Sequence, residues 1–272
     1  MSGGFPAAWL ALREPYDARA ADDRLAGRLS AWAASRGGPH VVDLGAGTGS
    51  TLRRLAPRLP AGQRWTLVEI DPALIAAGEA QLAGAAARYR RLDLRTDLEV
   101  LGDEAADVLA ASALLDLVSA DWVERLVALR RRLACALYAS LTHDGRIEWG
   151  PADPGDDEIR DAVNRHQRTD KGFGPALGRE AADTLRRRLA GPDEGTVGLA
   201  RSDWRLGPAD DAIQGALLDG YLGAASAIAP SRAGAFRDWR ERRARHLEAG
   251  RSELTVGHLD LLYLPTTSGR TA

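Results

Sequence analysis

The segment Val41-Val42-Asp43-Leu44-Gly45-Ala46-Gly47-Thr48-Gly49-Ser50 places three alternate glycines directly after a short apolar run. The apolar run predicts a buried strand, and the polar residues from Ser50 onward predict a helix. A glycine loop between a strand and a helix lets a ligand approach the backbone and exposes the N–H groups of the first helical turn. The segment therefore predicts a ligand-binding loop in an open α/β sheet.

Strands and helices are expected to alternate on both sides of this loop. An α/β fold follows, with a doubly wound, mostly parallel sheet of seven strands and helices on both faces. The strands are expected at residues 40–44, 65–70, 88–92, 107–111, 133–141, 196–206 and 254–264. Ligands in such sheets lie at the carboxyl ends of the strands, where the strand order switches.

Outside the sheet, the chain divides into a cover, two insertions and a tail. Residues 1–20 are expected to be irregular and to precede a helix over 21–35, so that 1–37 form an N-terminal cover for the main domain at 38–264. Helical insertions are expected after the fifth strand, as a lid over about 150–192, and between the last two strands, over about 209–249. A disordered tail is expected over 265–272.

Composition excludes several classes of protein. The chain has 272 residues and a net charge of −2, so no global positive field draws it to nucleic acid or to an anionic membrane. No apolar run is long enough for a membrane span, and Met1 to Ala20 does not have the pattern of a signal peptide. The single cysteine, Cys135, excludes an internal disulfide and a zinc cluster. A cytoplasmic protein with a bacterial type of composition and no metal is expected.

The spacing of the loop separates two cofactor classes. The pattern here is D-x-G-x-G-x-G, whereas the dinucleotide pattern G-x-G-x-x-G would require a glycine at Ser50. An acid at Asp43 suits a cofactor with a cationic amino-acid tail, such as S-adenosylmethionine (SAM), which carries an ammonium and a sulfonium but no phosphate. Glu69 ends the second strand, where a carboxylate can accept hydrogen bonds from both ribose hydroxyls. Asp93 follows the third strand, where it either meets the adenine amino group or caps the next helix.

This arrangement of a glycine loop and three acids resembles the class I SAM-dependent methyltransferases, over roughly residues 38 to 145. The resemblance implies that Asp43, Gly45, Ala46, Gly47 and Gly49 line the methionine part of SAM, that Glu69 and Ile70 hold the ribose, and that Asp93 and Leu94 hold the adenine. It also implies that residues 112–116 face the methyl group, with Ser112 on the cofactor and Leu115 on the acceptor.

Methyl transfer from a sulfonium depends mainly on positioning and desolvation, with a base only where the acceptor must lose a proton. The residues after the fourth strand lack the Asn/Asp-Pro-Pro-aromatic signature of base and glutamine methyltransferases, and the Pro-Cys of cytosine C5 enzymes. The candidate bases are Asp116, His143 and His166. His143 is expected just after the fifth strand, where it is either a base or a turn residue, and Asp116 either acts on the acceptor or pairs locally.

The second informative segment runs from Asn164 to Gly174. It contains the only lysine and the only asparagine of an Ala- and Arg-rich chain, which favours a lid that contacts the acceptor over a chance cluster in a connector. The substrate-binding candidates are Arg13, Tyr16, Leu115, Asn164, His166, Asp170, Lys171 and Phe173. Arg13 and Tyr16 either cover the same site or pack against the first helix.

The sequence therefore predicts a SAM-dependent methyltransferase that acts on an oxygen or nitrogen atom of a small molecule. The main alternative is a methyltransferase-like protein that binds SAM and has a non-methylating or protein-partner role. An aminopropyl-type transferase and a dinucleotide reductase are further alternatives, which the loop spacing and the post-strand residues disfavour. The helical insertion at 209–249 leaves a homodimer open, and no nucleic acid or membrane partner is expected.

Overall fold

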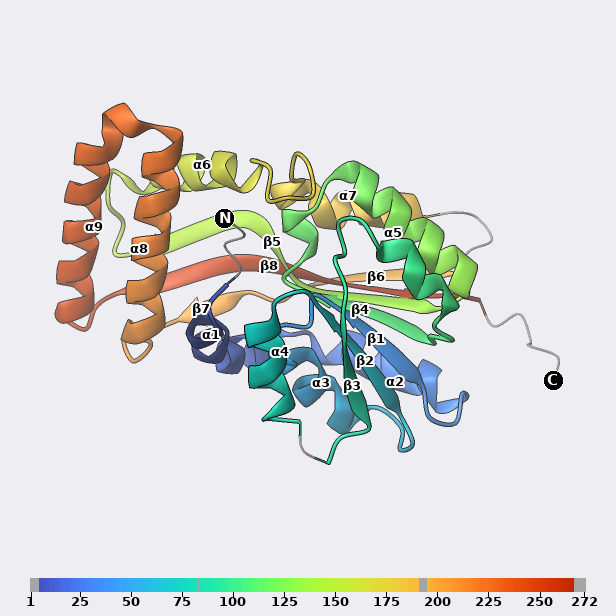
Figure 1. Ribbon diagram of the computed structural model, residues 1–272. Helices are drawn as coiled ribbons and strands as arrows, with labels where there is room; N and C mark the ends of the chain where they lie inside the picture. Colours follow the sequence, from blue (N-terminus) through green and yellow to red (C-terminus); the bar gives the residue numbers. More distant parts are fainter. Residues whose placement is uncertain (1–4, 83, 191–194, 267–272) are drawn as a thin grey trace.

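The computed structural model describes residues 5–82, 84–190 and 195–266, so most of the predicted tail lies outside the described residues. Its centre is one sheet of eight strands in the order β3-β2-β1-β4-β5-β8-β6, with β7 paired to β8 (Figure 1). The strands are β1 His40–Leu44, β2 Arg64–Glu69, β3 Ala87–Arg91, β4 Val108–Ser112, β5 Ala136–Gly150, β6 Thr196–Arg201, β7 Trp204–Leu206 and β8 Glu253–Leu264.

The strands from β3 to β5 are parallel, while β8 is antiparallel to β5, β6 and β7. The expectation of an α/β fold with a mostly parallel, doubly wound sheet is therefore confirmed. The strand expected over 196–206 is two strands, because Ser202 and Asp203 interrupt it. The chain order reverses between β1 and β4, which puts the switch point at the end of β1, beside the glycine loop.

Helices cover both faces of the parallel part of the sheet. On one face, α2 and α3 pack Leu29 and Leu55 against β1 and β2, and on the other, α5 and α7 pack Leu126 and Leu185 against β4 and β5. These elements are α2 Asp23–Ala34, α3 Ser50–Leu55, α4 Pro72–Glu79, α5 Ala120–Leu133 and α7 Ala181–Leu189, with short 3-10 helices at η1 Ala56–Arg58, η2 Leu98–Asp103, η3 Leu115–Leu117, η4 Gly178–Glu180 and η5 Pro230–Arg232.

A second lobe forms where β5 and β8 extend beyond their neighbours, towards α6, α8 and α9 (Figure 1). The helices are α6 Asp156–Gln167, α8 Asp211–Ile228 and α9 Ala233–Glu248. They bury a separate hydrophobic cluster around Trp149, Tyr221 and Trp239. Among the described residues, none of the helices is long and apolar enough to cross a membrane.

The N-terminal segment differs from its prediction, because residues expected to be irregular form a helix, α1 Ala7–Ala20, with Pro15 inside it. Proline lacks the N–H that would bond the carbonyl four residues earlier, which costs the helix stability. Tertiary packing offsets this cost, since Trp9, Leu12 and Tyr16 pack against the hydrophobic cluster of the second lobe.

The fifth strand also differs from its prediction, because β5 continues through Asp144-Gly145 to Gly150. The Asp-Gly pair is typical of a turn, but here it lies where the register of β5 and β8 shifts, between His143 and Ile147. Gly145 has a φ of 88°, which permits the local bend. His143 therefore lies inside a long strand and not after its end.

Candidate functional site

The glycine loop has the backbone conformation that its sequence predicts. Gly45, Gly47 and Gly49 have φ angles of 68°, 54° and 85°. Residues that carry a Cβ atom rarely adopt positive φ angles, whereas glycine does so readily. The space above the loop is narrow as well, because a Cβ built on Gly47 would lie 3.0 Å from Leu10 Cδ1 of α1. Helix α1 therefore lies over the loop and forms its cover.

Glu69 fixes the loop to the end of β2. Its carboxylate accepts hydrogen bonds from the backbone N–H groups of Gly47 at 2.9 Å, Ile70 at 2.8 Å and Asp71 at 3.0 Å. The predicted ribose ligand is thus also a structural residue of the loop. Each carboxylate oxygen has further acceptor capacity, because an ionised carboxylate offers about four lone-pair positions.

Asp43 lies beneath the loop, where Thr51 and Arg54 only partly offset the effect of burial on its carboxylate. Its side chain is completely buried, and neither carboxylate oxygen has a hydrogen-bond partner within the described part of the chain. Burial raises the pKa of Asp43 to about 7. A buried carboxylate without a donor is costly, and a ligand that brings an ammonium group removes that cost. The residue therefore fits the cationic amino-acid end of SAM.

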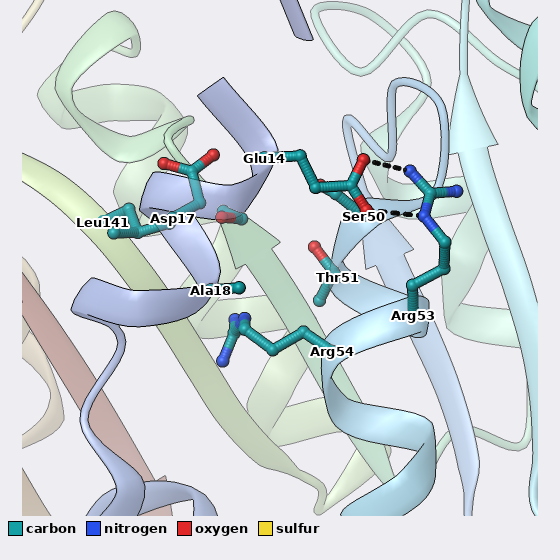
Figure 2. A pocket seen from close by; sticks show the side chains of 9 residues that line it. Glu14, Asp17, Ala18, Ser50, Thr51, Arg53, Arg54 and Leu141 are labelled. Atoms are coloured by element: carbon teal, nitrogen blue, oxygen red, sulfur yellow. Dashed lines mark hydrogen bonds and ion pairs between the residues drawn. The ribbon is translucent and has the colours of Figure 1, made fainter. Parts of the chain in front are cut away.

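A pocket of about 140 Å³ lies between α1 and α3. Figure 2 shows that Glu14, Asp17 and Ala18 of α1 face Thr51 and Arg54 of α3 across it. The lining residues are Glu14, Asp17, Ala18, Ser50, Thr51, Arg53, Arg54, Ser112 and Leu141. The predicted cofactor residue Ser112 is among them.

The two arginines of this pocket have different partners. Arg53 forms a two-bond ion pair with Glu14, with both N–O distances at 2.6 Å (Figure 2). Arg54 donates to the hydroxyls of Tyr138 at 3.3 Å and Ser140 at 3.0 Å, and no carboxylate of the described residues forms an ion pair with it. The charge of Arg54 acts on the nearby carboxylates of Asp17 and Asp43, but no ion pair among the described residues holds its guanidinium. Sequence reasoning missed Arg54, because an arginine in a helix gives no signal of the pocket above it.

The predicted adenine residues are engaged within the protein. The carboxylate of Asp93 pairs with the guanidinium of Arg95 at 2.6 Å, and this hydrogen bonding lowers the pKa of Asp93. The carbonyl of Leu94 accepts the indole N–H of Trp122 at 2.7 Å. Asp93 caps its own turn by accepting the N–H of Arg95 as well. The structure thus shows the local cap, and the adenine contact stays a prediction.

On the acceptor side, Asp116 and His143 come together. Both are buried, and Asp116 Oδ1 and His143 Nδ1 have no hydrogen-bond partner among the described residues. Burial raises the pKa of Asp116 and lowers the pKa of His143, while the charges of the two groups oppose these shifts. His143 is therefore neutral near pH 7, as a proton acceptor must be.

His258 also belongs to this cluster, although no motif in the sequence marks it. Its ring lies 5.9 Å from that of His143 and 5.0 Å from that of Trp204. Burial holds the pKa of His258 well below its ordinary value, so it is neutral too. Arg13 stacks over Trp204 at 5.0 Å, and Asp17 orients Arg13 by a 2.8 Å hydrogen bond. Helix α1 therefore places a cation at the edge of the histidine pair.

Asp260 holds the part of β5 that directly precedes His143. Its carboxylate accepts the N–H of Leu141 at 2.8 Å, the hydroxyl of Tyr138 at 3.2 Å and the N–H of Asp22 at 2.9 Å. Leu141 has a φ of 55°, in a bulge of β5 two residues before His143. The buried carboxylate thus ties the bulge to the start of α2.

The predicted lid runs across the carboxyl ends of the strands. At one end Asn164 donates to the carbonyl of Gly145 at 2.9 Å, and at the other Phe173 packs edge-on against Trp122 with ring centroids 5.8 Å apart. Between them, Lys171 Nζ lies 2.8 Å from the Thr169 hydroxyl and 3.4 Å from His166 Nδ1. Burial lowers the pKa of Lys171.

The remaining predicted site residues do not share one set of contacts. Asp170 accepts the N–H groups of Gly172 and Gly174 at 2.6 and 3.0 Å, so its carboxylate closes the lid turn. Leu115 is buried in the main core. Tyr16 packs against Trp204 with ring centroids 6.4 Å apart and faces a different cleft. The half-exposed Ile70 contributes its N–H to Glu69.

Comparison with known families gives one match. Residues 41–135, from β1 to the residue before β5, match a family described as "Methyltransferase domain". A comparison with curated proteins finds no match.

Solved structures with a similar chain course come from several bacteria. The YcgJ protein from Bacillus subtilis is 14% identical, covers 90% of this chain and 99% of its own, and has a TM-score of 0.51. A SAM-dependent methyltransferase from Thiobacillus denitrificans, in complex with S-adenosyl-L-homocysteine (SAH), is 16% identical over 96% of this chain and 100% of its own, with a TM-score of 0.48. The likeness to the YcgJ protein shows a shared fold.

Proposed function

We propose, since residues 41–135 match a methyltransferase domain, that the chain transfers the methyl group of SAM to an oxygen or nitrogen atom of a small molecule. The match agrees with the predicted resemblance to the class I SAM-dependent methyltransferases, and we propose SAM as the cofactor. The observation that carries the proposal is Asp43, a buried carboxylate without a hydrogen-bond partner at the end of β1. It supplies the site for the ammonium of SAM.

The two ends of the amino-acid tail would then have separate partners. Asp43 opposes the ammonium group, and Arg54, whose guanidinium is in no ion pair within the described residues, opposes the carboxylate. Glu69 faces the ribose hydroxyls from the end of β2 while it holds the loop. When bound, SAM supplies a methyl group on a sulfonium, which is an excellent leaving group. The chain's own residues therefore bind, orient and exclude water.

On the acceptor side, His143 is placed to take the proton that a hydroxyl or ammonium loses. Its imidazole is neutral because burial lowers its pKa, and Asp116 favours the imidazolium that forms. Arg13 and the lid residues Asn164 to Phe173 would close over the acceptor. The proposed acceptor class, the homodimer and a cytoplasmic location rest on the sequence arguments above.

Calorimetry with SAH, NAD and ATP tests the cofactor. SAH alone is expected to bind, because the site offers an acid for an ammonium group and no cradle for phosphates. Binding of NAD and not of SAH would contradict the proposal. Transfer of labelled methyl from SAM to a panel of small phenols, carboxylates and amines then tests the reaction. Binding of SAH without transfer to any member would favour a non-methylating role.

A Glu69→Ala variant is expected to bind SAH about 10- to 100-fold more weakly. The change removes charge-assisted hydrogen bonds to the ribose, each worth about 1.5–3 kcal/mol, and releases the N–H of Gly47. Isothermal titration calorimetry measures the affinity, with the exposed Glu79→Ala on α4 as a matched control. Undiminished binding by the Glu69 variant would refute the ribose assignment.

An Arg54→Leu variant is expected to bind SAH about tenfold more weakly, since a charge-assisted hydrogen bond to the ligand carboxylate is lost. Arg58→Leu, in the turn that follows α3, removes the same charge from an exposed position and should leave the affinity unchanged. A second titration, with adenosine, which has no amino-acid tail, separates the roles. The Arg54 variant should bind adenosine as the wild type does, and an equal loss for both ligands would show a general effect on the loop.

A further inference from the structure

A second cleft lies on the other side of α1 from the cofactor pocket. Its volume is about 390 Å³, within the range of small-molecule sites. Tyr16 and Arg19 of α1 form one wall, and Arg201 and Arg205, at the end of β6 and in β7, form the other. Figure 1 shows α1 directly beside β7, so the cleft joins segments about 180 residues apart.

The charges in this cleft favour an anion. Arg201 and Arg205 are exposed, and within the described part of the chain neither side chain forms a hydrogen bond or an ion pair. Arg19 forms one long ion pair, with Asp210 at 3.5 Å. Guanidinium groups prefer carboxylate and phosphate oxygens, which they bind with two parallel hydrogen bonds.

The one acid that lines the cleft forms its ion pair with another arginine. Asp203 lies between Arg201 and Arg205 in the chain and feels the charge of Arg201, but its carboxylate is held by Arg146 at 2.6 and 3.1 Å and accepts the N–H of His258 at 3.3 Å. Its side chain is only 6% exposed. The acid therefore belongs to the buried network behind the cleft.

The aromatic side of the cleft is rigid. The buried Trp204 is fixed by a hydrogen bond from its indole N–H to Asp17 at 3.1 Å, and its ring packs against Tyr16. The guanidinium of Arg19 lies 4.6 Å from the centre of the Tyr16 ring. A fixed apolar wall next to mobile cations suits a small molecule with one apolar face and one anionic group.

We propose that this cleft binds a small oxyanion, a carboxylate or a phosphate ester, through Arg201 and Arg205 with Arg19. The anion site itself is separate from the cofactor pocket, and only its coupling to SAH rests on the proposed function. Because the ligand would contact both α1 and the β6–β7 segment, it holds α1 in place. The other end of α1 covers the glycine loop through Leu10 and through the Glu14–Arg53 ion pair. Binding in the cleft therefore strengthens SAH binding, and the coupling is reciprocal.

Calorimetry with inorganic phosphate and with malonate, at constant ionic strength, tests the site. One of the two anions is expected to bind the wild-type protein with a dissociation constant below about 1 mM, which is ordinary for a small anion on two arginines. Tighter phosphate binding indicates a phosphate ester, and tighter malonate binding indicates a carboxylate. The double variant Arg201→Ala/Arg205→Ala should lose at least tenfold in affinity.

The control variant Arg237→Ala/Arg251→Ala removes two exposed arginines elsewhere and changes the net charge equally. It should bind the anion as the wild type does. Binding of SAH by the Arg201/Arg205 variant, measured without anion, reports that the fold and the cofactor site are intact. The proposal is overturned if neither anion binds the wild type, or if the control loses as much affinity as the cleft variant.

Discussion

An Asp43→Asn variant is expected to be more stable than the wild type without ligand at pH 8, and to bind SAH at least 100-fold more weakly. The carboxylate is buried without a hydrogen-bond partner in the described structure, and its pKa is raised from 3.8 to about 7. In the unfolded chain the same group ionises near pH 4. Ionising Asp43 above pH 4 is therefore less favourable in the folded protein than in the unfolded chain, which lowers the free energy of unfolding.

The sign follows from proton binding. Between pH 4 and 7 the folded protein binds more protons at Asp43 than the unfolded chain, so the free energy of unfolding falls as pH rises through this range. About three pKa units correspond to roughly 4 kcal/mol, an upper figure because the asparagine amide is buried as well. Thermal unfolding of both proteins at pH 5 and pH 8 measures this difference in stability. The asparagine variant should gain stability relative to the wild type only as the pH is raised.

The affinity for SAH should have the opposite dependence. The ammonium group binds the ionised carboxylate, so wild-type affinity is expected to rise between pH 5.5 and 7 and then to level off. Asp43→Asn removes this dependence and leaves the ammonium unpaired, a loss of about 3–5 kcal/mol for a buried pair. Titration calorimetry across this range measures both effects. An asparagine variant with wild-type affinity at pH 7.5 would show that Asp43 does not contact the ligand.

A His143→Asn variant is expected to lose about 10²- to 10⁴-fold in the rate of methyl transfer, the usual range for removing a general base. SAH affinity should change little, since His143 lies on the acceptor side. Because burial holds the pKa of His143 below its usual 6.5, wild-type kcat/KM for the acceptor, at saturating SAM, should be constant above pH 6.5 and fall at lower pH. The rate is measured with whichever acceptor the labelled-methyl panel identifies.

His246→Ala, on α9 outside this cluster, is the control and should keep the wild-type rate. Asp116→Asn should lose less than His143→Asn, because it removes only the charge that stabilises the imidazolium. A His143 variant with an unchanged rate and pH profile would mean that the acceptor needs no base. Catalysis would then rest on positioning alone.

The loop and its acids could be predicted from the sequence because their geometry is local. The end of β1, the three glycines and Glu69 at the end of the next strand lie within 29 residues, and parallel pairing of β1 with β2 brings them to one edge. The spacing also disfavoured a dinucleotide loop. Asp93 shows the limit of such reasoning, since its carboxylate is taken by Arg95 two residues away.

What the tertiary structure alone decided lies in contacts between distant segments. The antiparallel register of β5 and β8 places His258 beside His143, 115 residues apart. Packing on the second lobe makes α1 a helix despite Pro15, and so brings Leu10 over the glycine loop, Arg13 beside the histidine pair and Tyr16 to the second cleft. The sequence by itself determined the glycine loop and its acids, because glycine conformation and strand ends depend on nearby residues. The proposed acceptor side was decided by strand register and helix packing, which have no local signal.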